Sequence, residues 1–314
     1  MAKLFNIAVC LSGQARTWKT ASDNILNYFN TKICIERNMR VRVDYFIHTW
    51  DTNSYRDKTE PRWQNKDYKI INPLEEEDIR LTFLPADMEY EIYDSTKHLH
   101  AWSGLFYSFM KSVNLKRKYE LENDITYDMV VKSRLDINFP QEGINKYGEP
   151  ISKFHPHMLR PLTAYPSSPT PTRFPTEFNQ SCFDDVFYYA DSPTMDLISN
   201  IYFWYKDIMD KGLAQRQRKE FVSNPEYYYG PGTLLYKYIT NWNIHPYADH
   251  ANPYYVVRKV AQENGLHSIN DWKQIQELHF DWYENGYGKE QTELIEKLVN
   301  EGMPVNILKS SRVI

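Results

Sequence analysis

The stretch that most constrains this chain is Tyr127–Phe139, which reads Y-D-M-V-V-K-S-R-L-D-I-N-F. Its short apolar run, M-V-V, has the composition of a central strand covered on both faces of a sheet. Three polar residues follow at a spacing of two, Arg134, Asp136 and Asn138. In an extended chain they project to the same side. Because ligands of open α/β folds bind outside the carboxyl ends of the strands, this stretch predicts a ligand site at such an edge.

Asp136 and Asn138 are the candidate metal ligands of this stretch. Their short oxygen side chains suit a hard divalent cation, Mn²⁺ or Mg²⁺, that keeps several waters and shares substrate phosphates. The prediction requires the Asp136 carboxylate to lie at an accessible edge near residues 12–16, not inside a packed interior. Asn138 contributes a carbonyl oxygen and no charge, which leaves open a second interpretation, a binding protein whose metal motif has decayed.

A second ligand-binding segment is expected near the start of the chain. The apolar run Leu4–Leu11 predicts a strand, followed by a tight turn and a helix from about Thr20 to Tyr28. A glycine in such a turn lets backbone approach a ligand, and amides at a helix start favour phosphate. An ordinary strand-to-helix turn with a surface Arg explains the same residues equally well. The candidate donor-binding residues here are Ser12, Gly13, Gln14 and Arg16, the last by a charge-assisted contact to a diphosphate.

Further strands and helices alternate along the chain, which predicts an α/β fold. The expected strands are Val41–Trp50, Glu89–Tyr93, Val186–Tyr189 and Ile244–His250, and the expected helices are His98–Glu122, Met195–Gly212 and Thr233–Thr240. Residues 140–180 are rich in Pro, Ser and Thr and predict a surface loop or lid without sheet or helix. The basic run Lys116–Lys118 is interpreted as a solvated face that complements the helix dipole.

Two motifs carry a resemblance to a known family. The segment R-L-D-I-N-F resembles the D-x-D region of GT-A-type glycosyltransferases, and I-A-V-C-L-S-G-Q-A-R resembles the first strand and nucleotide loop of a phage and bacterial branch of that class. The similarity covers most of residues 4–250. It implies a GT-A-like, Rossmann-type mixed sheet flanked by helices, a nucleotide-sugar donor bound by Ser12–Arg16, Arg134 and Asp136, and a divalent metal.

The resemblance also implies roles for residues later in the chain. An acid near Val186–Tyr189 faces the acceptor in many inverting members, and an acceptor hydroxyl needs a base within hydrogen-bonding reach. Asp184 and Asp185 are adjacent and point to opposite sides, so one of them serves, and Asp185 is favoured; an Asp pair bonded to turn amides is the structural alternative. His250 is the implied third metal ligand, although a lone His is more often structural.

The expected domain organisation is a GT-A-like catalytic domain over residues 1–255 and a small helical C-terminal extension over residues 256–314, where charged amphipathic segments begin. No apolar run approaches the roughly 20 residues that span a bilayer. The three Cys lack a C-x-x-C pair and indicate reduced thiols. These features, with the absence of a signal-peptide pattern, predict a cytoplasmic enzyme of a bacterium or of a virus-infected cell.

The sequence is compatible with two classes of acceptor. A glycan is the usual acceptor of the resembled class, and the phage-like motif adds a hydroxymethylated pyrimidine in DNA. The net charge of -4 argues against binding of nucleic acid by bulk charge. A local basic groove would instead have to form from Arg56, Arg62, Lys116–Lys118 and Arg216–Lys219. A Rossmann-type oxidoreductase is disfavoured because the first turn lacks the glycine fingerprint.

Overall fold

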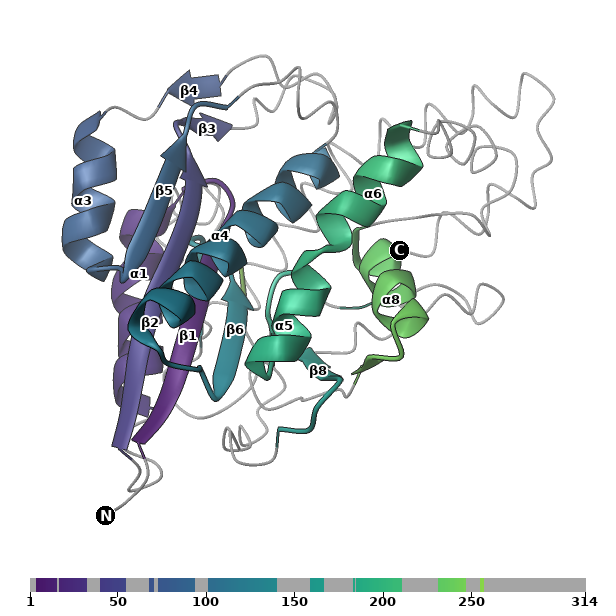
Figure 1. Cartoon of the computed structure of the whole chain (residues 1–314). Helices are drawn as coiled ribbons and strands as arrows, with labels where there is room; N and C mark the ends of the chain where they lie inside the picture. The colour runs from purple at the N-terminus through teal and green to yellow at the C-terminus, as the bar shows by residue number, and fades with distance from the viewer. Residues whose placement is uncertain are drawn as a thin grey trace, which may run out of the picture.

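The computed structural model describes residues 4–15, 17–32, 40–54, 68–70, 73–93, 101–139, 159–166, 183, 185–210, 231–246 and 255–256. They form an α/β fold with a seven-stranded mixed sheet, mostly parallel and flanked by helices, which confirms the predicted class (Figure 1). No helix among these described residues is long and apolar enough to cross a membrane.

Four parallel strands and the helices between them form the centre of the molecule. Their bounds are β1 (Leu4–Ser12), α1 (Trp18–Asn27), β2 (Arg40–Trp50), α3 (Pro73–Phe83), β5 (Asp87–Glu91), α4 (Ala101–Asn123) and β6 (Met129–Ser133). The other elements are the π-helix η1 (Tyr28–Lys32), β3 (Thr52–Ser54), β4 (Tyr68–Ile70), β7 (Ile137–Asn138), β8 (Thr163–Pro166), β9 (Tyr188–Ala190), α5 (Ser192–Ser199), α6 (Ile201–Asp210), α8 (Pro231–Asn241), β10 (His245–Pro246) and β11 (Tyr255–Val256).

The strand order of the sheet is β10-β8-β9-β6-β1-β2-β5. β1 pairs in parallel with β2 on one edge and with β6 on the other, and β5 pairs in parallel with β2. The chain therefore adds β2 and β5 on one side of β1, then crosses over to place β6 on the other. β9 runs antiparallel to β6 and closes the parallel part of the sheet.

Alternation along β1 directs its side chains into two hydrophobic clusters, one on each face of the sheet. Ile7, Val9 and Leu11 join the cluster that α1 and α3 cover. Ala8 and Cys10 join the cluster formed with α4, α5, α6 and α8. The near-continuous apolar run of this strand is thus explained by burial on both faces, as expected of a parallel strand with helices on both sides.

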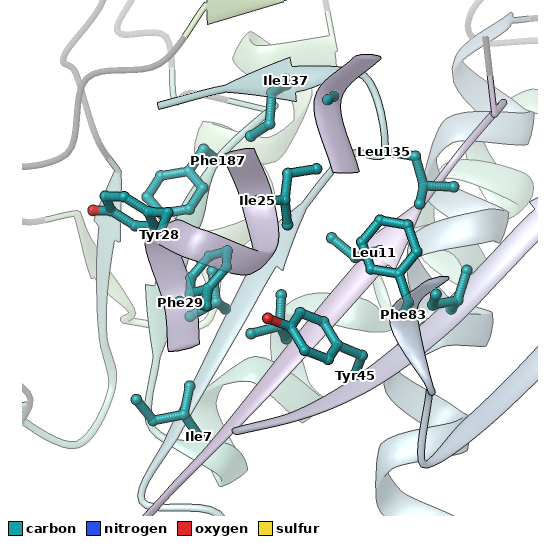
Figure 2. Packing of buried hydrophobic residues seen from close by; sticks show 14 of the residues in the cluster. Ile7, Leu11, Ile25, Tyr28, Phe29, Tyr45, Phe83, Leu135, Ile137 and Phe187 are labelled. Carbon is teal, nitrogen blue, oxygen red and sulfur yellow. The ribbon is translucent and has the colours of Figure 1, made fainter. Parts of the chain in front are cut away.

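The stretch 127–139 does not stay extended, so the prediction that Arg134, Asp136 and Asn138 share one side of a strand is wrong. The chain turns at Leu135–Asp136, between β6 and β7. Leu135, Ile137 and Phe139 enter the cluster under α1, and Figure 2 shows the first two among Leu11, Ile25 and Phe187. Burial of these alternating apolar residues against α1 outweighs continuation of the strand.

The turn is fastened to α1 by one side chain. Asn24 Nδ2 donates to the Phe139 carbonyl at 2.8 Å, and the Phe139 amide donates to Asn24 Oδ1 at 2.6 Å. The Phe139 ring stacks on Tyr28 with a centroid separation of 3.9 Å. A paired backbone group and a stacked ring together fix where the chain passes over the end of the sheet.

Three other segments differ from the sequence-based expectation. The single helix expected over Met195–Gly212 is two helices, α5 and α6, separated by a turn at Asn200. The Pro-rich segment 140–180 contains a strand, β8, whose proline lies at its last residue, Pro166. β11, a strand that the sequence did not predict, pairs with β7 at Tyr255↔Asn138. The predicted helical extension beyond Val256 lies outside the described residues and is untested.

We expect Asn24→Ala to lower the free energy of unfolding by about 1–3 kcal/mol, because the Phe139 amide loses its partner in a packed environment. Chemical denaturation measures the change. Asn114→Ala, which removes an exposed Asn from α4, is the control and should stay within about 0.5 kcal/mol of the original protein. Equal effects of the two substitutions would show that the Asn24 side chain does not hold the turn.

Candidate functional site

The strand order creates a topological switch point between the carboxyl ends of β1 and β6. From this place the chain winds to one side through β2 and β5, with α1 and α3 on one face, and to the other through β6, with α4 on the opposite face. Ser12 Oγ donates to the Ser133 carbonyl at 3.5 Å and joins the two strand ends. Ligands of open α/β sheets bind at such a point, so it is the candidate site.

Gly13 adopts the conformation that a turn requires, with φ of +109°. Its amide donates to Ser108 Oγ of α4 at 2.7 Å and to the His48 carbonyl at 3.2 Å. This N–H therefore faces protein groups, and the expected contact between it and a phosphate is not supported by the geometry. Gln14 is half-buried beside it, and Arg16 lies outside the described residues.

Arg134 and Asp136 form a bidentate ion pair across the turn that follows β6. Arg134 Nε lies 2.7 Å from Asp136 Oδ1, and Nη2 lies 2.6 Å from Oδ2. The Asp136 side chain is 1% exposed, whereas that of Arg134 is 20% exposed. Fork-to-fork pairs of this kind are strong and fix the direction of the guanidinium. The partly exposed group of this pair is therefore the Arg134 guanidinium, and the Asp136 carboxylate that holds it is buried.

The described residues do not fit a divalent metal site as they stand. Both Asp136 oxygens already accept from Arg134, so a cation would have to replace the guanidinium at one of them. Asn138 is buried and lies in β7, paired with Tyr255. His250 lies outside the described part of the chain, and within that part no group of three or more His, Cys, Asp or Glu side chains could hold a metal. The prediction required an accessible Asp136 carboxylate, and this side chain is buried and paired, so the structure does not support Asp136 as a metal ligand. Binding of Mn²⁺ or Mg²⁺ elsewhere in the chain stays a prediction.

Asp185 lies next to the switch point because of how β9 pairs with β6. The antiparallel register sets Lys132 opposite Tyr188, so Asp185, three residues before Tyr188, lies towards the carboxyl end of β6. Lys132 Nζ donates to the carbonyls of Asp185 and Val186, the latter at 3.0 Å. The predicted base is thus brought to the same edge as Arg134, and Asp184 lies outside the described residues.

Two buried lysines were missed by the sequence-based interpretation. Lys132 is 2% exposed and lies 5.8 Å from the Tyr188 ring centroid. Lys116 is fully buried and bonds Ser192 Oγ, Glu120 and Asp196 at 2.5, 2.8 and 2.7 Å. The expectation that Lys116 is part of a solvated basic face is wrong, because its ammonium joins α4 to α5. Burial raises the pKa of Asp196 in this cluster, and Lys116 opposes that shift.

A polar cluster lies beside the switch point, at the ends of β2 and β5. Glu91 accepts from the Tyr107 hydroxyl at 3.0 Å and pairs with Lys111 at 2.9 Å. His48 Nε2 lies 3.6 Å from Glu91 Oε1, which is an ion-pair distance and longer than a hydrogen bond. His48, and then Lys111, hold the pKa of Glu91 well below its usual range. Burial, and then Glu91, raise the pKa of Tyr107 to about 12.

Trp50 and Asp51, at the end of β2, both contact other parts of the protein. Trp50 is 3% exposed and stacks on Tyr107 with a centroid separation of 5.5 Å. Asp51 Oδ1 accepts from the Tyr93 amide at 2.7 Å and fastens the end of β2 to the segment after β5. Both side chains therefore shape this edge of the sheet from within.

Comparison with known proteins adds no relative from which residue roles can be transferred. No protein-family model matches the chain, and no curated protein matches it significantly. The site is therefore defined by its geometry alone.

We expect Lys132→Met to lower the free energy of unfolding by about 1–3 kcal/mol, since two carbonyls lose their charged donor. Urea denaturation measures this change, and limited proteolysis after residue 185 reports loosening of the segment that carries Asp185. Lys118→Met is the matched control because Lys118 is 60% exposed, and it should change stability by less than about 1 kcal/mol. A Lys132→Met protein at least as stable as the original would contradict a supporting role.

Glu91 should make a pH-dependent contribution to stability. Its pKa in the folded state lies below its ordinary value of 4.5, so the stabilisation is present above about that pH and is lost as the pH falls. The groups facing it are His48, Tyr107, Lys111 and Glu89.

The measurement is the difference in unfolding free energy between the original protein and Glu91→Gln, from pH 7 to pH 3. We expect a difference that is largest near pH 7 and shrinks below pH 4.5. Glu122→Gln, at an exposed position of α4, should give a difference near zero throughout. A difference for Glu91→Gln that does not vary with pH would rule out the ion-pair cluster as its source.

Proposed function

We propose that this chain binds a nucleotide-sugar donor at the switch point and transfers its sugar to an acceptor hydroxyl. The proposal is carried by the switch point, where Ser12–Gln14 lie at the end of β1 and Arg134 follows β6. Ser12 is hydrogen-bonded to Ser133, the residue before Arg134, and in the described sheet the winding direction reverses between these two strands. Binding of nucleotides at such a place follows from the geometry of open α/β sheets.

Arg134 is the group that meets the diphosphate in this proposal. Its guanidinium keeps a permanent positive charge, and Asp136 fixes its orientation through both oxygens. As the bond between the anomeric carbon and the diphosphate oxygen breaks, negative charge grows on the leaving group. A fixed cation stabilises that charge more than it stabilises the bound donor, which is the requirement for catalysis.

Asp185 is the proposed base. The acceptor oxygen forms the new bond to the anomeric carbon, its proton passes to the Asp185 carboxylate, and the nucleoside diphosphate leaves with the electron pair of the broken bond. Lys132 holds the Asp185 backbone at the carboxyl end of β6, so this residue and Arg134 belong to the same edge of the sheet. No step depends on a metal; Mn²⁺ or Mg²⁺ enters the proposal as a variable of the experiment.

The acceptor is proposed to be a glycan, with a hydroxymethylated pyrimidine of DNA as the second class. Lys116 is buried and makes no part of a groove. Arg117 and Lys118 are exposed but lie 3.4 Å from Asp196 and Asp87. Activity on free sugars that is insensitive to salt would support the first class. A steep salt dependence of duplex binding would support the second.

A non-catalytic nucleotide- or sugar-binding protein is the alternative, and one observation favours it. The carboxylate expected to hold a metal is occupied on both oxygens by Arg134. Such a protein would bind a donor without breaking it.

The test is incubation with UDP-, GDP-, CMP- and dTDP-sugars, with and without Mn²⁺, followed by thermal denaturation and by assay for slow hydrolysis. At 100 times its dissociation constant a bound ligand stabilises the folded chain by about 2.7 kcal/mol. We expect one nucleotide class to raise the melting temperature and to be hydrolysed slowly. Arg134→Met should weaken its binding about tenfold or more, because a hydrogen bond to a charged group is lost.

Two further variants separate the outcomes. Arg117→Met, at a half-exposed position of α4, should bind like the original protein. Asp185→Asn should keep donor binding and lose transfer. Binding without hydrolysis or transfer would identify the non-catalytic alternative, and the absence of any nucleotide-dependent shift would rule out both.

A further inference from the structure

We propose that Ser108, oriented by His48, is the positioning residue of the loop Ser12–Gln14. The effect of Ser108 on donor binding rests on the proposed function, because the loop is one side of the proposed donor site. The positioning of the loop by Ser108 does not depend on that function. It assigns a role to a buried serine and a buried histidine that lie outside every predicted motif.

A chain of contacts, two of them within hydrogen-bonding distance, runs from the loop to β5, the edge strand of the sheet. The Gly13 amide donates to Ser108 Oγ at 2.7 Å, and Ser108 Oγ lies 2.8 Å from His48 Nδ1. His48 Nε2 then faces Glu91 Oε1 at 3.6 Å. Ser108 and His48 are both fully buried. These four residues come from the turn after β1 and from α4, β2 and β5, so the contacts join the elements on one side of the switch point.

The positions of the protons follow from the available donors and acceptors. Glu91 Oε1 lies 3.6 Å from His48 Nε2, beyond hydrogen-bonding distance, and its negative charge favours a hydrogen on that nitrogen through electrostatics alone. In the neutral ring Nδ1 then accepts from the Ser108 hydroxyl, which in turn accepts from the Gly13 amide. The Gly13 amide and the Ser108 hydroxyl then donate in the same direction, and hydrogen bonds aligned in this way strengthen one another. The His48 carbonyl, 3.1 Å from Ser108 Oγ, is a second acceptor for the same hydroxyl.

The same three residue types form the nucleophile, base and acid of many hydrolases, but this arrangement does not serve that chemistry. Ser108 Oγ is enclosed, and a backbone amide already occupies one of its lone pairs. No substrate carbonyl reaches it. The chain therefore orients a peptide instead of activating a nucleophile.

The peptide that it orients is the one between Ser12 and Gly13. The amide and carbonyl of a trans peptide point in opposite directions, and the described residues contain no cis peptide. With the Gly13 N–H directed to Ser108 and the His48 carbonyl on the β2 side, the Ser12 carbonyl is directed to the β6 side of the switch point. The contacts of Gly13 therefore fix the direction of the Ser12 carbonyl at the switch point, where Ser12 itself is 4% exposed.

The test uses the full chain labelled with ¹⁵N and compares Ser108→Ala with Ser112→Ala. Ser112 is a matched control because it is fully buried one turn further along α4, and its hydroxyl donates to the Phe109 carbonyl of the same helix. In the unliganded protein, Ser108→Ala should speed hydrogen exchange of the Gly13 amide about tenfold, because one of its two acceptors is lost. Ser112→Ala should leave that rate unchanged.

His48→Asn tests the contact between Ser108 and His48. Asn keeps a polar atom near the place of Nδ1 and removes Nε2, so Gly13 exchange should rise less than in Ser108→Ala. The affinity for whichever of the UDP-, GDP-, CMP- and dTDP-sugars binds the original protein is the second readout. Ser108→Ala should weaken it about tenfold, with a loss of melting temperature similar to that of Ser112→Ala.

Gly13 exchange that is equal in the two serine variants would overturn the proposal. So would an unchanged donor affinity in Ser108→Ala when the original protein binds a donor. If the original protein binds none of the four nucleotide classes, the proposed function fails, and the Gly13 exchange rates alone then decide whether Ser108 positions the loop.

Discussion

β1 is hydrogen-bonded along both edges, to β2 and to β6, and the rest of the structure depends on this double pairing. A strand that is paired on both sides and covered on both faces has every backbone group satisfied and almost no solvent contact. Its side chains divide between two clusters, so both helical layers are fixed by one segment. The carboxyl ends of three parallel strands are thereby brought to one edge, where the chain has its polar turn residues.

Each of the following charged side chains at this edge has a charged or polar partner. Arg134 is held by Asp136, Lys111 by Glu89 and Glu91, and Lys132 by two carbonyls that precede β9. A charge that is taken from water costs several kcal/mol unless partners surround it. The pairs therefore keep charged groups at an edge that is otherwise aromatic and buried. Of these groups, Arg134 directly follows β6 at the switch point and is partly exposed, which is why it carries the proposed function.

Much of the fold could be predicted from the sequence because its signals are local. The runs of β1, β2 and β6 are apolar enough to indicate buried strands, and the aromatic stripe of α4 has helical spacing. The sequence of α3 did not indicate a helix, because the helix buries few of its side chains and so lacks a clear apolar face. Ile79 and Phe83 are among the buried ones.

The details of the site depended on contacts that no local pattern encodes. Arg134 and Asp136 were identified, but not their pairing, because the turn at Leu135 is set by packing against α1. Lys116 and Lys132 look like surface residues by type. Apart from Glu120, four residues after Lys116, the partners that accompany their burial lie 53 to 80 residues away in the chain. Ser108 and His48 belong to no motif, and only the fold of α4 across β1 and β2 brings them to Gly13.

The pairing of β1 with β6 also sets the order in which the molecule is completed during translation. Ile7 pairs with Met129, 122 residues later (129 minus 7). At about 5–20 residues per second, one edge of β1 waits roughly 6 to 24 s on the ribosome for its partner. An apolar strand with an unpaired edge is a template for wrong pairing in that interval. Nascent chains should therefore depend on holding chaperones until β6 emerges, and synthesis rate should affect the yield of native protein more than it affects final stability.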